Sequence, residues 1–262
     1  MFGWLTERRR KHLLETPFPD AWRAILDANV AAYPRLGADR QHRLRDLVQV
    51  FVAEKHWEGC GGLEMTDDIR VTVAGTGCLM LIARDHDLFA QVMSILVYPS
   101  AVVGPTSVSL YGLAHGPVKP RDVVIGEAHH RGPMILAWDA VKSGAADHDD
   151  GRNVVIHELA HKIDYLDGAA DGTPPLPDTA SIRHWTEACS GAFLALRRSI
   201  KRGTRHFLRD YAATNEAEFF AVASETFFER PAELRAELPD VFAVLREFYG
   251  YDLIEPATVG AG

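Results

Sequence analysis

The chain has 262 residues, which is long enough to bury a full hydrophobic core. Hydrophobic residues make up 47% of it and charged residues 24%, and these values exclude a disordered or fibrous protein. The formal net charge of -8 is not typical of a protein that binds nucleic acid, so we expect no direct nucleic-acid partner.

The sequence gives no sign of a membrane or secretory protein. No apolar run approaches the roughly 20 residues that a membrane-spanning helix needs. The opening MFGWLTERRR has its charges after a short apolar patch, which is the reverse of a signal peptide. Three widely spaced cysteines form neither a disulfide framework nor a CxxC zinc pattern. We therefore expect a cytoplasmic protein with no membrane partner.

The first third of the chain is predicted to be helical. Hydrophobic periodicity and turn signals predict helices over residues 5–15, 20–31 and 39–58. Residues 67–83 are ambiguous, because Ile69, Val71 and Val73 alternate as in a strand while the apolar run continues to Leu81 as in a buried helix.

The middle of the chain is predicted to contain strands and the last part helices. Strands are expected over residues 94–104, 122–128 and 133–138. Pro133 suits an edge strand, which could hold an extended peptide or simply be part of the core. Helices are expected over residues 150–166, with Asp149 or Asp150 as cap, and over 181–201, 215–229, 231–237 and 239–249. No repeat or linker divides the chain, so we expect one domain, 1–262, with a helical part over about residues 1–60.

The segment NVVIHELAHKIDYLDG, residues 153–168, contains a candidate metal site. His157 and His161 are four positions apart, so on a helix they lie on one face and can bind the same ion. Glu158 is rotated about 100° from His157, where it can act on a water molecule without being a ligand. Asp164 lies on the same face and would either accept a ligand histidine's N–H or be an ordinary polar residue near the helix end.

A catalytic zinc ion usually has three protein ligands, so a third must come from elsewhere in the chain. The segment YAATNEAEFFAVASETFFE, residues 211–229, offers four glutamates, of which Glu216 and Glu229 fall at the ends of the predicted helix. Glu218 lies in its apolar part, where a buried carboxylate needs a compensating cation. Spacing favours Glu218, and it leaves Glu225, seven residues on, as a competing ligand or a partner of one.

Four segments, in order ILVYPSAVV, GPMILAW, HELAHKID and YAATNEAEFFAVASETFF, resemble the Mlc titration factor A family of bacterial zinc metallopeptidases. The resemblance implies an α+β fold with a zincin-like, gluzincin-type core, in which a small mixed sheet and the HExxH helix are surrounded by additional helices. It also implies a helix over residues 67–83. The family's proteins are described as cytosolic aminopeptidases that also bind a transcriptional repressor of sugar uptake.

Carried over by position, the resemblance implies one Zn²⁺ per chain held by His157, His161 and Glu218. It makes Glu158 the general base for hydrolysis of a peptide substrate, and it points the hydroxyl of Tyr211 at the site, where it would donate to the oxyanion. From the residues alone, Tyr211 could equally be a half-buried loop aromatic. The competing functional hypothesis is a non-catalytic protein that sequesters a regulator and contains a structural zinc site.

Overall fold

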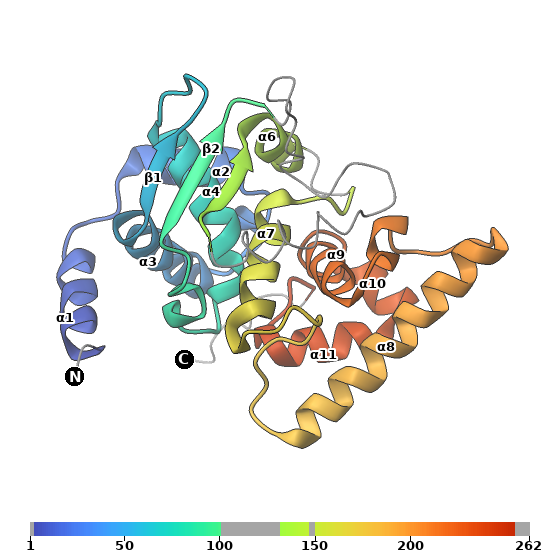
Figure 1. The fold of residues 1–262 in the computed structure, drawn as a ribbon. Coiled ribbons are helices and arrows are strands. Elements are labelled where there is room, and N and C mark those ends of the chain that lie inside the picture. Colours follow the sequence, from blue (N-terminus) through green and yellow to red (C-terminus); the bar gives the residue numbers. More distant parts are fainter. Residues whose placement is uncertain (1–2, 101–131, 147–149, 255–262) are drawn as a thin grey trace.

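The computed structural model describes residues 3–100, 132–146 and 150–254, and it is mostly helical with one small sheet (Figure 1). The helices before the sheet's second strand are α1 (Gly3–Leu14), α2 (Asp20–Asn29), α3 (Ala38–Glu54) and α4 (Asp67–Cys78). Those after its third strand are α6 (Trp138–Ala146), α7 (Val154–Asp164), α8 (Thr179–Arg202), α9 (Glu216–Glu229), α10 (Pro231–Glu237) and α11 (Pro239–Tyr249). Apart from α4 and α6, each corresponds to a predicted helix, with differences at the ends.

The sheet contains three described strands in the order β1 (His56–Gly59), β2 (Ser94–Tyr98) and β3 (Met134–Ala137). Both pairings are parallel, whereas the resemblance implies a mixed sheet. The predicted strand 122–128 and the last part of the one predicted over 94–104 lie outside the described residues. Helices around a small sheet agree with the predicted α+β class, and the zincin-like core remains a prediction.

The helix predicted over residues 39–58 is too long. It ends at Glu54, and the chain becomes extended at Lys55 to enter β1. The amide of His56 donates to the carbonyl of Met93 at 2.9 Å, which starts the pairing with β2. A contact between segments far apart in sequence therefore overrides the local helical pattern, which is a known weakness of strand prediction.

The ambiguous segment 67–83 is a helix, α4, followed by a 3-10 turn at Leu79–Leu81. Thr66 caps it by accepting from the amide of Ile69. The helix is buried on all sides from Val71 to Cys78, so its apolar residues show no helical stripe and the pattern suggests a strand. Gly77 allows close contact with α7, because a Cβ there would lie 2.5 Å from Leu159 Cδ1. The glycine thus brings α4 directly against the helix that carries the two histidines.

Helix α7 lies between the sheet with its helices and the C-terminal helices (Figure 1). It contacts α4, α6 and β3 on one side and α9 on the other. The helix starts later than predicted: Asn153 is its cap and accepts from the amide of Ile156, while Asp149 lies outside the described residues. Asn153 also contacts two glutamates of α9, described below, so the start of α7 is fixed by tertiary contacts as well as by local sequence.

The loop after α7 joins three helices at Gly172. Its amide donates to both carboxylate oxygens of Asp164 at 2.9 and 3.1 Å, and its carbonyl accepts from Trp185 Nε1 at 2.9 Å. Gly172 has φ +78, and a Cβ there would lie 2.3 Å from the carbonyl oxygen of Glu216. Only glycine fits this backbone conformation and this contact. The ends of α7, α8 and α9 are therefore held together at one residue.

No helix among residues 3–100, 132–146 and 150–254 has the length and apolar character required to cross a membrane.

Candidate metal centre

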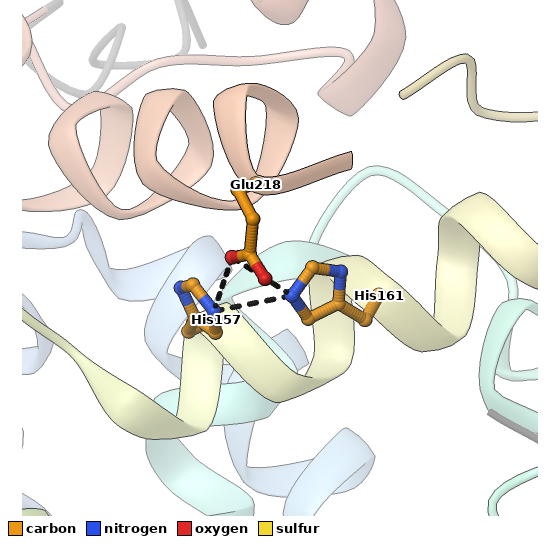
Figure 2. Close-up of side chains that lie close together, drawn as sticks. All are labelled: His157, His161 and Glu218. Atoms are coloured by element: carbon orange, nitrogen blue, oxygen red, sulfur yellow. Dashed lines mark hydrogen bonds and ion pairs between the residues drawn. The ribbon is translucent and has the colours of Figure 1, made fainter. Parts of the chain in front are cut away.

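Helices α7 and α9 bring His157, His161 and Glu218 together (Figure 2). The two imidazoles project from α7, and the carboxylate reaches them from α9. The Nε2 atoms of the histidines are 3.1 Å apart, and Glu218 Oε2 lies 3.2 Å from that of His157 and 3.4 Å from that of His161. This is the one group of three potential metal-binding side chains in the described part of the chain.

The spacing of these three atoms fits a zinc ion. Zinc at about 2.0 to 2.1 Å from tetrahedral ligands places the ligand atoms about 3.3 Å from one another. The side chains are also well shielded, with exposed fractions of 14%, 11% and 16% for His157, His161 and Glu218. Two imidazoles and one carboxylate are a common zinc donor set. The residues present therefore fit the metal that the HExxH pattern predicts.

The electrostatics of the centre also favour a cation. Burial alone would raise the pKa of Glu218, but hydrogen bonds with His157 and His161 hold it well below its ordinary value. Burial would lower the pKa of His157, yet Glu225 and Glu218 raise it to about 10. The carboxylates thus keep positive charge at this position, and a metal ion would take the place of the proton.

Glu225 lies behind the candidate metal-binding group rather than within it. Its Oε1 is 2.8 Å from His157 Nδ1, on the opposite side of the imidazole from Glu218. The carboxylate is 2% exposed, and it also accepts from the amide of Asn153 at 2.6 Å and from the guanidinium of Arg209. A His157 Nδ1–H that donates to Glu225 leaves the Nε2 lone pair facing the centre. Of the two carboxylates between which spacing does not decide, Glu218 approaches both histidines and Glu225 contacts His157 from behind.

Replacing Glu225 should weaken metal binding without removing a ligand. We expect Glu225→Gln to lower zinc affinity about 10- to 100-fold, because the side-chain amide is uncharged and has a single acceptor oxygen. It cannot accept from His157 and Arg209 at one position and from the Asn153 amide at the other, as the carboxylate does. Competition with a chromophoric chelator measures the change. Glu216→Gln, in the exposed first turn of α9, is the matched control and should bind zinc as the unmodified chain does. Equal affinity in both variants would contradict the orienting role.

Glu158 and Tyr211 both lie near the centre. Burial raises the pKa of Glu158, while the neighbouring histidines oppose the shift. The ring of Tyr211 lies 5.9 Å from that of His157, and burial, the charge of Glu218 and a hydrogen bond with Glu218 raise its pKa. Tyr211 is therefore part of the centre's surroundings and not only a loop aromatic. Asp164 is 1% exposed, and it binds the Gly172 amide described above.

Two residues that form polar contacts around the centre are absent from the sequence prediction. Arg209, which pairs with Glu225, lies in a loop with no motif that suggests the contact. Asn153 has a recognisable cap position, but its contacts with Glu225 and Glu229 depend on the packing of α7 against α9. Only the cap could have been found from the sequence.

Glu229 is buried, with 9% of its surface exposed. We expect its replacement by glutamine to change the stability of the chain in a pH-dependent way. Burial, followed by the charges of Glu225 and Asp150, raises its pKa from 4.5 to about 8. The folded chain therefore holds an extra proton between these values, and the stabilising contribution of Glu229 falls as pH rises through that window. Glu229→Gln cannot ionise, and its oxygen can still accept from Asn153 Nδ2. Its stability relative to the unmodified chain should rise by about 1 kcal/mol or more between about pH 5 and pH 9.

Urea unfolding of both proteins across that pH range tests the prediction. Glu237→Gln, on the exposed side of α10, is the control and should show a constant difference from the unmodified chain. A difference for Glu229→Gln that does not change with pH would show that Glu229 is ionised in the folded protein throughout.

Comparison with known proteins identifies the family. The family model described as glucose-regulated metallo-peptidase M90 matches residues 4–250. The chain belongs to this metallopeptidase family. An uncharacterized protein of Synechocystis sp. is 32% identical over 94% of this chain and 89% of its own length. The Mlc titration factor A of Edwardsiella ictaluri is 30% identical, covering 89% of this chain and 93% of its own length. That of Serratia proteamaculans is 33% identical over 81% of this chain and 80% of its own length.

Membership of the M90 family supports a peptidase-type function that depends on a metal ion. The relatives confirm the resemblance to Mlc titration factor A that four sequence segments indicate. The family and the side-chain geometry thus agree on metal chemistry, although they come from independent observations.

Proposed function

We propose that this chain is a zinc-dependent peptidase whose single zinc ion is held by His157, His161 and Glu218. The observation that carries the proposal is the set of separations between their ligand atoms, 3.1, 3.2 and 3.4 Å, which match a tetrahedral zinc ion. Three protein ligands leave the fourth position for water, as in catalytic sites, whereas structural zinc sites usually have four protein ligands. This corresponds to the gluzincin arrangement of HExxH plus a distant glutamate.

Zinc bound there would lower the pKa of water to near 7 and polarise the scissile carbonyl. Glu158 is the general base, which takes the proton of the attacking water and passes it to the departing amine. Its raised pKa suits both steps, because a carboxyl group titrating closer to neutrality can accept and then release a proton. Tyr211 keeps its proton at neutral pH, and its hydroxyl can donate to the developing oxyanion.

The substrate is proposed to be a peptide, cleaved in the manner of an aminopeptidase. The test compares one short peptide with a free amino terminus and the same peptide acetylated, each incubated with the zinc-loaded chain. Release of the first residue from the free peptide alone is the expected result. Equal internal cleavage of both peptides would retain the peptidase and reject the aminopeptidase assignment.

The proposed protein partner is a transcriptional repressor of sugar uptake, because several relatives have the name Mlc titration factor A. Calorimetric titration of the chain with its organism's own repressor of that type would measure the interaction. The competing function is regulator sequestration without catalysis, with zinc in a structural role. Repressor binding together with no hydrolysis of any peptide by the zinc-loaded chain would favour that alternative.

A further inference from the structure

A pocket of about 450 Å³ lies outside the metal centre and is lined mainly by the segment between α4 and β2. Arg43 of α3 lines one side of it. The rest is formed by residues that follow the 3-10 turn after α4, which are Ile82, Ala83, Arg84, Asp85 and Leu88. Its size is within the range of about 300 to 1,000 Å³ that is typical of small-molecule sites.

Arg84 is a partly buried cation with no anionic partner among the described residues. Its guanidinium carbon lies 4.6 Å from the centroid of the Phe248 ring, so the ring holds the group against one wall. The Nε atom is buried and has no hydrogen-bond partner, and burial lowers the pKa of the side chain. A guanidinium stays charged in proteins, so its burial costs free energy. The contact with the Phe248 ring offsets only part of that cost.

Arg43 adds a second cation to the same pocket. Its Nη2 donates to the backbone carbonyl of Arg84 at 3.1 Å, which fixes the two arginines relative to each other. The neighbouring carboxylates of Glu54 and Asp87 are paired with Arg10. Asp85 also lines the pocket, but it is exposed and forms no ion pair with either arginine within the described ranges. The local charge is therefore positive in a chain whose net charge is -8.

We propose that this pocket binds a small oxyanion, such as the phosphate or carboxylate group of a small metabolite, through Arg84 and Arg43. Planar guanidinium groups bind such oxyanions with paired N–H donors, and the contact with Phe248 holds one of them in a fixed plane. The pocket's size and the acidic character of the whole chain favour a small ligand over a nucleic acid. The site is separate from the proposed peptidase function, because it shares no residue with the metal centre.

The test titrates the full, zinc-loaded chain with inorganic phosphate and, separately, with succinate, while NMR follows the side-chain Nε–H of Arg84 and the amides of Ala83 and Phe248. Saturable shifts with the unmodified chain are expected below about 10 mM ligand, which corresponds to weak small-molecule binding. The anion that binds more tightly identifies which source, phosphate or carboxylate, the pocket prefers.

Arg84→Gln and Arg43→Gln should each weaken binding at least tenfold, while Arg198→Gln on the exposed face of α8 removes the same charge and should leave it unchanged. Binding of the anions to the zinc ion would be the same in all variants, so the comparison with Arg198→Gln separates it from binding to the pocket. If Arg84→Gln does not fold, as judged by circular dichroism, Arg43→Gln decides the question. Absence of saturable shifts in the unmodified chain, or equal affinity in Arg43→Gln and Arg198→Gln, would overturn the proposal.

Discussion

Glu158→Gln is expected to reduce peptide hydrolysis by about 10²- to 10⁴-fold or more while zinc content stays at one equivalent. Glutamine is nearly the same size as glutamate, but its amide cannot accept the proton of the attacking water. Glu158 lies beside His157 in α7 but does not belong to the candidate metal-binding group, so its replacement should leave that group complete. Peptide cleavage and elemental analysis are measured on the same preparation.

A matched control for this substitution is Glu187→Gln, an exposed glutamate of α8 that changes the charge equally. Its activity should equal that of the unmodified chain. Hydrolysis that persists in Glu158→Gln would mean that another group is the base. Loss of zinc from Glu158→Gln would instead show that Glu158 helps to hold the ion.

Glu218→Ala is expected to lower bound zinc from about one equivalent to a small fraction of it, with hydrolysis lost in parallel. The substitution removes the only carboxylate of the ligand group and leaves two histidines from a single helix. His157→Ala should have the same effect, since each variant retains two of three ligands. Elemental analysis after dialysis against metal-free buffer provides the measurement.

The thermal stability of the chain gives a second readout for the metal site. Zinc at a thousandfold excess over its dissociation constant should stabilise the folded chain by about 4 kcal/mol, and this gain should be absent in Glu218→Ala. Glu216→Ala, two residues earlier in α9 and exposed, should keep both the zinc and the gain. A full equivalent of zinc in Glu218→Ala would place the metal elsewhere in the chain.

The candidate ligands can be predicted from the sequence because two of them are set by helical spacing and the third by its apolar neighbours in the chain. His157 and His161 share a face of α7 through their four-residue separation, and Glu218 is a carboxylate in an apolar stretch of α9. Spacing alone does not separate Glu218 from Glu225. Their different roles depend on which side of the His157 ring each approaches, and that follows from how α9 packs on α7.

Errors in the predicted fold occur where distant contacts decide the structure. Residues 56–59 continue a helical pattern, and only the pairing with β2 makes them a strand. The alternating residues of α4 suggest a strand because the helix is buried on all sides and loses its polar face. Arg209 illustrates the same limit for the metal centre, since its contact with Glu225 arises from the folded arrangement of a loop and a helix.

The contacts of Gly172 with α7, α8 and α9 help to position His157, His161 and Glu218. Because that residue ties the end of α7 to the first turn of α9, both ligand-bearing helices are positioned by the protein's own packing. An ion entering the proposed site would then meet side chains that are already in position, so little of its binding free energy would be lost to ordering the chain. Insertions in the loop around Gly172 should therefore be poorly tolerated.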